Sequence, residues 1–387
     1  MIARYTGPAG NGVFSLFITN VSFFILFFGF SIDSTIVYFG SKGKINLSWI
    51  VSMLLPLLVI QCSLFAATLF IAHFFFHSTL FQTGVTTDGA FWAFAFIFSN
   101  ILYNYFSAFL LSKKVFFKIS LYNVIAQALL LGWMLLEKQT GGSAVFVIED
   151  LIPVYTCLYI VNGVVVIILA FKTNTEKVEF KNPFKIFDKQ MLQYTGLVFA
   201  GNTLQFFAYR VDIWLMEYYH SRYALGIYAL SSKIAQLWWL IPQLVATLLF
   251  PLTALGHQSV SEKKFFRIIA MAVACSLVTA IAAIFIFPFF IDIAVGALYR
   301  DSYFPFLFLM PGIVMWSVNI LIAARLAGEG NVSINLQGSA LCFILILVLD
   351  FWLIPSKAAV GAAVASSIAY SCSTIFVIVK YLKWRKK

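Results

Sequence analysis

The sequence predicts an all-α polytopic membrane protein. Of its 387 residues, 62% are hydrophobic and only 11% are charged, and the mean hydropathy is +0.94. A soluble core cannot hide that much apolar side chain, whereas a bundle of membrane-spanning helices exposes it to lipid. The Lys and Arg residues behind the net charge of +11 fall mostly in short loops between apolar runs. This placement argues against a nucleic-acid partner.

The first half of the chain predicts five membrane spans. Residues 1–11, MIARYTGPAGN, lack the cationic region, apolar stretch and cleavage site of a signal peptide, and we expect them to form a loop. Apolar runs long enough to cross a hydrocarbon core of roughly 30 Å come next. They occupy residues 12–38, 49–76, 90–112, 119–136 and 151–171.

A long polar stretch, residues 172–190, divides the chain. We expect an N-terminal helical bundle over residues 1–171, a cytoplasmic loop between bundles over 172–190, and a C-terminal six-helix bundle over 191–387. Its spans are predicted at residues 191–219, 224–253, 265–290, 304–327, 336–353 and 359–382, which brings the total to eleven.

Positive charge predicts the orientation of these spans. Most of the 26 Lys and Arg residues lie in alternate loops and in the C-terminal sequence KYLKWRKK. Positively charged loops stay on the cytoplasmic side of a membrane. We therefore expect a multi-pass membrane protein with its C-terminus in the cytoplasm and Met1 on the outer side.

A short internal repeat predicts how the two bundles are related. Residues 12–16 read GVFSL, residues 226–230 read GIYAL, and an Arg-Tyr pair precedes each. The second copy follows one span of its half, whereas the first follows none. We expect a twelve-helix architecture of two six-helix bundles around a central cavity, with the first helix absent from this chain. Such bundles would be parallel repeats about an axis along the membrane normal.

Two cations, Arg210 and Lys233, lie deep inside apolar runs. At about 1.5 Å per residue, each is about 13 Å from the loop that joins their spans. A charge at this depth costs about 3 kcal/mol in lipid and usually faces a protein interior or a water-filled cavity. Two cations at one level favour an anion-binding site. The alternative is that each is a structural charge paired with a neighbour.

Polar side chains follow one face of each of these two spans. On an ideal helix, four polar residues of the first span fall within about 80° of one another, namely Asn202, Gln205, Tyr209 and Asp212. Two adjacent polar stripes indicate a hydrated cavity or, alternatively, hydrogen bonds that join the helices of a bundle. Besides the two cations, we expect substrate contacts from Asn202, Gln205, Tyr209 and Gln236.

Buried acidic residues are candidates for binding a coupling ion. Asp212 lies in the first polar stripe, and Asp350 lies near the outer end of its span. Either carboxylate could bind a proton or Na⁺. Arg325 lies near the cytoplasmic end of its span, and we expect it to extend toward the lipid headgroups.

The sequence lacks the signatures of an enzyme. The outer loops are short and carry no cluster of acid, base and nucleophile, and there is neither a Walker motif nor a GxGxxG motif. The five cysteines lie within apolar runs without metal-ligand spacing. We expect no enzymatic activity, no cofactor and no metal site.

Several segments resemble one family of membrane proteins. Residues 3–16, ARYTGPAGNGVFSL, are similar to the A-R-x-L-G-P-E-G-x-G-x-Y-S-L stretch of bacterial polysaccharide exporters of the O-antigen flippase type. Residues 209–212 (YRVD), the GIYAL segment, residues 353–355 (LIP) and residues 361–363 (GAA) resemble later regions of that family. These exporters belong to the multidrug/oligosaccharidyl-lipid/polysaccharide (MOP) flippase superfamily, and their twelve helices form two bundles of six.

The resemblance implies a function in surface polysaccharide biosynthesis at the bacterial cytoplasmic (inner) membrane. Members of the family move an undecaprenyl-diphosphate-linked oligosaccharide to the outer leaflet by alternating access, driven by H⁺ or Na⁺. The expected partners are this substrate, the coupling ion, membrane lipid, and a polymerase and other polysaccharide assembly proteins. Arg210 and Lys233 would then offset the diphosphate charge. The alternatives are a multidrug/cation antiporter of the same superfamily and a membrane enzyme of polysaccharide assembly such as a polymerase.

Overall fold

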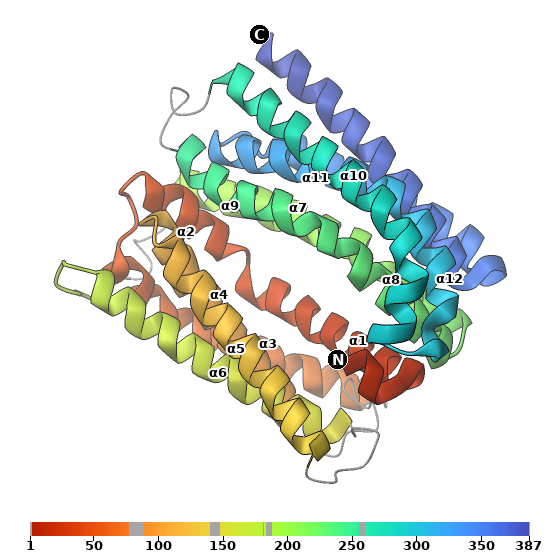
Figure 1. The fold of residues 1–387 in the computed structure, drawn as a ribbon. Coiled ribbons are helices and arrows are strands. Elements are labelled where there is room, and N and C mark those ends of the chain that lie inside the picture. The colour runs from red at the N-terminus through yellow and green to blue at the C-terminus, as the bar shows by residue number, and fades with distance from the viewer. Residues whose placement is uncertain are drawn as a thin grey trace. The chain divides into compact units, whose positions relative to one another are not determined.

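The computed structural model describes residues 2–76, 89–139, 148–180, 182, 188–254 and 261–386, and all secondary structure in these ranges is helical (Figure 1). The chain forms two compact units. Unit 1 consists of Met1–Thr19 and Leu197–Lys387, and unit 2 consists of Asn20–Gly196. The all-α membrane fold predicted from the sequence is confirmed.

Unit 2 is built from the helices of the first half of the chain. The single span predicted at 12–38 is two helices, because Phe30 and Ser31 take positive φ angles of 50° and 53° and break it. The helices of unit 2 are α1 (Ile2–Gly29) from residue 20 onward, α2 (Ile32–Ser41), α3 (Leu47–Phe76), α4 (Gly89–Ser112), α5 (Phe116–Gln139), α6 (Ile148–Thr173) and the start of α7 (Lys189–Tyr219).

The predicted loop at residues 1–11 is wrong, because α1 begins at Ile2. The helix is interrupted at Gly7, whose φ is 66° and ψ is 176°. A glycine adopts this conformation without steric cost. Pro8 follows, and its fixed φ suits the first turn of the helix that restarts there. The Gly-Pro pair thus kinks the segment without ending it.

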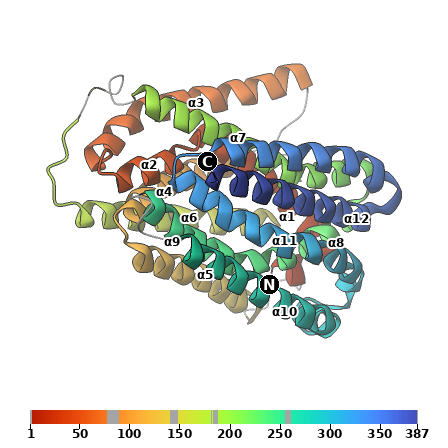
Figure 2. The same cartoon turned by 90° about the horizontal axis from the view of Figure 1, so that it is seen from above.

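Unit 1 contains the helices of the second half. The span predicted at 224–253 is α8 (Arg222–Gln236) and α9 (Leu240–Ala254), joined by the short 3₁₀ helix η2 (Leu237–Trp239). The remaining elements are α10 (Glu262–Ala294), the 3₁₀ helix η3 (Ala297–Ser302), α11 (Tyr303–Gly328) and α12 (Ser333–Arg385). Helices α11 and α12 lie side by side in both views (Figures 1 and 2).

The described residues contain nine helical segments long and apolar enough to span a membrane. Helix α7 is not among them, because uncharged polar residues such as Gln193, Asn202 and Gln205 lower the hydropathy of its first part, and Arg210 and Asp212 lower that of the rest. Helix α12 has 53 residues and kinks at Ala358, where φ is 45°, so it can cross twice. Counted with α7 and with both halves of α12, the described helices give the eleven predicted spans.

The expected division of the chain at residues 172–190 stays a prediction. Helix α6 ends at Thr173 and α7 begins at Lys189, and residues 181 and 183–187 of this loop lie outside the described residues. We expected residues 1–19 in the first bundle, whereas they pack with residues 197–387 in this structure. The physical reason is a close backbone contact between α1 and α8.

Candidate transport site

Lys233 lies on α8 and contacts the GVFSL segment of α1. Its ammonium donates a hydrogen bond to the Ser15 hydroxyl at 3.0 Å and lies 5.4 Å from the centre of the Phe14 ring. The Lys233 side chain is exposed, whereas Ser15 is buried. A hydroxyl and an aromatic ring hold this ammonium, and neither neutralises its charge.

Arg210 lies on α7, and its guanidinium charge acts on the Lys233 ammonium. The side chain is half-buried. Within the described part of the chain, neither cation forms an ion pair with a carboxylate. The charge of Arg210 also acts on the Asp212 carboxylate, two residues along α7, so the alternative of a structural charge near a neighbour of opposite sign stands beside the anion site. Two like charges near each other favour the approach of an anion.

The polar stripe of α7 is tied into an aromatic cluster inside unit 1. Tyr209 accepts hydrogen bonds from Gln205, at 2.6 Å, and from the Trp316 indole. The Tyr209 ring packs against Trp239 and Tyr370, with ring centres 5.3 and 5.9 Å away. These contacts match the alternative in which polar side chains join the helices of a bundle.

The two remaining polar residues of the expected substrate set lie elsewhere along these helices. Asn202 is half-buried on α7, one turn before Gln205. Gln236 is half-buried on α8 and donates to the Ser232 hydroxyl at 3.0 Å, a bond within its own helix. The role of both in substrate binding stays a prediction.

Two buried carboxylates lie near each other on α7 and α12. Asp212 accepts a hydrogen bond from the Tyr228 hydroxyl, and its charge acts on the carboxyl group of Asp350. Asp350 is fully buried at 0% exposure, and neither of its oxygens has a hydrogen-bond partner among the described residues. A buried carboxylate without a donor is costly unless it binds a proton or a cation. The described residues hold no group of three or more His, Cys, Asp or Glu that could bind a metal ion.

The prediction that Arg325 extends to the headgroups is wrong. Its side chain is only 3% exposed and pairs with Glu262 at 2.5 Å and with Glu329 at 3.0 Å. Arg385 also pairs with both glutamates. The network joins the start of α10 to the ends of α11 and α12. The sequence feature that could have predicted this network is the position of Glu262 and Glu329 at the ends of apolar runs, where either could reach Arg325.

The fold of the chain is similar to that of solved membrane transporters of the MOP superfamily. A solved outward-facing multidrug resistance MATE family transporter of that superfamily matches with a TM-score of 0.73 and 12% identity, covering 100% of this chain and 90% of that one. A MOP superfamily transporter from Pyrococcus furiosus, for which a reverse polarity of the binding pocket suggests a different function, matches with a TM-score of 0.71 and 12% identity. The match covers 99% of this chain and 89% of that one.

Part of the sequence is also similar to a curated archaeal protein. The probable low-salt glycan biosynthesis flippase Agl15 of Haloferax volcanii is 21% identical over 207 residues. These residues make up 52% of this chain and 43% of the relative, so the match spans less than half of the relative's length. No protein-family model matches the sequence.

Proposed function

We propose that this protein is a lipid-linked oligosaccharide flippase. It moves an undecaprenyl-diphosphate-linked repeat unit from the cytoplasmic to the outer leaflet, for O-antigen, capsule or exopolysaccharide synthesis. The observation that carries this proposal is the pair of cations on α7 and α8, Arg210 and Lys233, whose charges act on each other and which form no ion pair with a carboxylate among the described residues.

The chemistry of the pair suits a diphosphate. An arginine offers donors in a planar fork that matches phosphate oxygens, and a lysine adds a compact charge with three donors. Both lie in segments predicted to be deep in the membrane, where an uncompensated diphosphate would be strongly destabilised. The two cations would offset that charge at the step where the headgroup crosses hydrocarbon.

The Haloferax volcanii relative supports the same function. It is a probable glycan biosynthesis flippase, which agrees in class with the resemblance of the GVFSL and YRVD segments to polysaccharide exporters. The solved Pyrococcus furiosus transporter offers a parallel, since a change in pocket polarity is associated there with a different function within one fold.

Asp212 and Asp350 would supply the coupling to an ion gradient. A proton or Na⁺ bound between them would neutralise the buried carboxylate that has no hydrogen-bond donor, and its release would restore the charge. Occupied and empty forms of this pair would then favour different packing of α7 against α12. Such a difference is what couples an ion to alternating access.

A multidrug or cation antiporter is the second candidate. The same buried carboxylates favour it, because acidic groups attract cationic substrates, and MATE transporters share the fold. The unneutralised cations disfavour it, because a cationic drug would be repelled by Arg210 and Lys233.

The test uses cells that lack their own polysaccharide flippase and express this protein. We expect the wild-type chain to restore surface polysaccharide, and Arg210→Gln or Lys233→Gln to abolish it at unchanged membrane abundance. Arg300→Gln is the matched control, since Arg300 is exposed and already paired with Asp292 at 2.8 Å. Normal export by the Arg210→Gln/Lys233→Gln double variant would refute the cation site. Lower ethidium accumulation without any export would identify the antiporter.

A further inference from the structure

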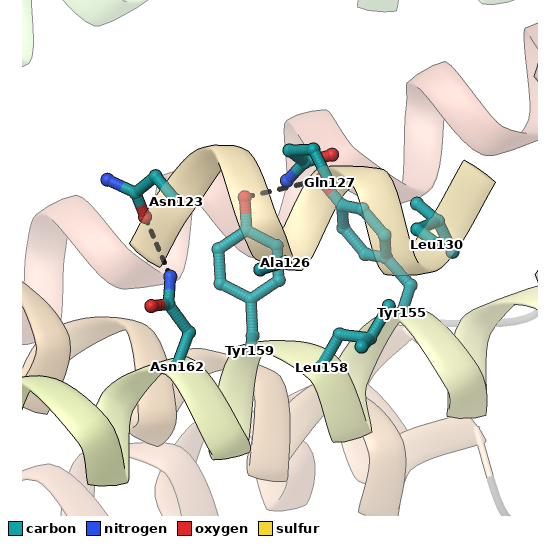
Figure 3. A pocket seen from close by; sticks show the side chains of 8 residues that line it. All are labelled: Asn123, Ala126, Gln127, Leu130, Tyr155, Leu158, Tyr159 and Asn162. Carbon is teal, nitrogen blue, oxygen red and sulfur yellow. Dashed lines mark hydrogen bonds between the residues drawn. The ribbon is translucent and has the colours of Figure 1, made fainter. Parts of the chain in front are cut away.

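A polar pocket lies between α5 and α6 of unit 2 (Figure 3). Asn162 of α6 donates to the Asn123 carbonyl oxygen of α5 at 2.7 Å. Asn162 is only 7% exposed, and its own side-chain oxygen has no partner among the described residues. The space inside is about 20 Å³, which suits one water molecule rather than a larger ligand. A water that donates to Asn162 would complete this network.

A larger, apolar groove lies in unit 1, between α10 and the segment where η2 joins α9. It has a volume of about 240 Å³. Leu237 and Ile241, on the η2–α9 side, are each 54% exposed. A 3₁₀ turn in the middle of a span, such as η2, often marks a functional hinge. The residues that line the groove are Leu237, Trp238 and Ile241 on one side and Cys275, Ser276 and Thr279 on the other.

The polar groups at the edge of the groove are bonded to one another. The Trp238 indole donates to the Thr279 hydroxyl at 2.9 Å, and this hydroxyl donates to the Cys275 carbonyl oxygen at 2.8 Å. The Trp238 ring also meets the buried Phe306 ring edge to face, with centres 6.0 Å apart. A fixed indole whose N–H is already paired suits an apolar chain better than a polar ligand.

The groove begins one helical turn after a cation. Lys233 lies four residues before Leu237, about 6 Å along the helix axis, and both side chains are exposed. At the other end, Leu244 and Leu248 are exposed and continue the apolar face of α9 beyond Ile241. A charge, an apolar groove and an apolar helix face thus follow one another along α8 and α9.

Hydrophobicity alone does not hold a chain in this groove, because lipid tails are as apolar as its lining. Binding must come from close packing and from a charge that anchors one end of the ligand. A polyprenyl diphosphate meets both conditions, since its diphosphate is joined directly to a branched apolar chain. An ordinary lipid keeps its headgroup at the membrane surface, whereas Lys233 is predicted to lie about 13 Å from the nearest loop.

We propose that this groove holds the first isoprene units of the lipid-linked substrate while Lys233 binds its diphosphate. The inference rests on the proposed flippase function and deepens it, because it assigns the lipid part of the substrate to unit 1. Pockets that enclose a drug-sized ligand measure roughly 300–1,000 Å³. A groove of about 240 Å³ therefore holds only the start of the chain, and the rest stays in the bilayer.

The test is photo-crosslinking to the full chain in phosphatidylcholine nanodiscs. The probe is farnesyl diphosphate with a diazirine on its first isoprene unit, and the crosslinked residues are mapped by mass spectrometry of peptides. We expect labelling within residues 237–241 and 275–279, and we expect excess undecaprenyl diphosphate to remove it. Lys233→Gln should lower the labelling at limiting probe by at least about tenfold, the effect of one lost charge-assisted hydrogen bond.

A substitution that fills the groove separates the lipid chain from the diphosphate. Cys275→Trp should lower the labelling by at least about fivefold, because the added ring occupies the space of the chain. Ala274→Trp is the matched control, since Ala274 is exposed beside Cys275 and does not line the groove. It should leave the labelling unchanged. Inorganic pyrophosphate should stabilise both variants as it does the wild type, because the cations are intact in both.

The outcomes distinguish this inference from the proposed function. Labelling at other residues that still depends on Lys233 would refute the groove and leave the flippase proposal standing. Labelling of the groove that persists in Lys233→Gln and disappears when phosphatidylglycerol is added would assign the groove to an ordinary membrane lipid and overturn the inference. If undecaprenyl diphosphate removes no labelling at any residue, both the groove and the lipid-linked substrate are wrong.

Discussion

Gly12 of α1 and Gly226 of α8 pack backbone to backbone in a reciprocal contact. A Cβ atom added at Gly12 would overlap the carbonyl oxygen of Arg222, and one added at Gly226 would overlap that of Pro8. Each obstructing carbonyl lies four residues before the partner glycine. Asn11 closes the contact by donating to the Gly226 carbonyl at 2.9 Å. A symmetry axis between the GVFSL and GIYAL segments would produce this reciprocity, which supports their interpretation as copies of one repeat.

This contact predicts that alanine at either glycine destabilises the protein. An extra methyl group has no space there, and forcing it into a packed contact costs about 1–3 kcal/mol. Thermal unfolding of Gly12→Ala and Gly226→Ala in detergent should show the loss. Gly132→Ala is the control, because a Cβ at this α5 position meets no atom within 4 Å. Equal melting temperatures for Gly12→Ala and Gly132→Ala would contradict the assigned packing.

The Asp212–Asp350 pair predicts opposite effects on stability and on transport. Asp350→Asn replaces a fully buried carboxylate that has no hydrogen-bond partner among the described residues with a neutral group of the same shape. At a pH high enough to ionise Asp350, we expect the free energy of unfolding of Asp350→Asn to exceed that of the wild type by about 1–3 kcal/mol, since a buried charge costs more than a buried amide. Export driven by a proton or Na⁺ gradient should fall to background.

Asp301→Asn is the control for that substitution. Asp301 is exposed in the 3₁₀ helix η3, so neither property should change there. A stabilised Asp350→Asn variant that still exports in response to the gradient would remove Asp350 from the coupling role. A destabilised variant would show that the carboxylate has a partner essential to the fold.

The ion network around Arg325 predicts that removing one charge of a buried pair destabilises the protein much more than replacing both charges with apolar side chains. Glu329 is 1% exposed and pairs with both Arg325 and Arg385. Glu329→Gln leaves the two arginines with Glu262, which is half exposed, as their one shared carboxylate among the described residues, and should cost about 3 kcal/mol. The Arg325→Met/Glu329→Leu double variant removes both charges and should recover most of that loss. Chemical denaturation measures both, and a loss below 1 kcal/mol in Glu329→Gln would place the pair at a solvated surface.

How much of this structure follows from sequence depends on the range of the interactions. The spans follow from hydropathy, because each apolar run must find lipid or core whatever its neighbours are. The break at Phe30 and Ser31 escaped prediction, because neither residue usually takes positive φ and the run stays apolar through both. The Arg325 network escaped for another reason. Its partners come from three helices, and hydropathy says nothing about which helix ends meet.

The candidate site likewise has features that the sequence predicts and features that need the structure. That Arg210 and Lys233 lie within spans is visible in the sequence, whereas the absence of an ion pair for either among the described residues needs the structure. Gln205 and Tyr209 share a stripe as predicted, but their hydrogen bonds and ring contacts turn to the core of unit 1. The α5–α6 pocket was missed, although Asn123, Gln127, Tyr159 and Asn162 recur at helical spacing. No charge drew attention to it.

The Arg210–Lys233 interaction predicts that removing one cation stabilises the protein and abolishes export. Lys233→Gln relieves like-charge repulsion and loses only a bond to Ser15 and a ring contact. The free energy of unfolding should therefore stay constant or rise by up to about 1 kcal/mol.

Inorganic pyrophosphate supplies the second measurement. At a hundredfold excess over its Kd, a bound anion stabilises the wild type by about 2.7 kcal/mol, whereas Arg210→Gln and Lys233→Gln should lose most of that gain. Lys233→Arg keeps the charge and should keep the response. A Lys233→Gln variant that is less stable than the wild type but exports normally would instead assign the lysine a structural role. Unfolding is measured without substrate, so a loss of stability there would show that the charge serves the fold.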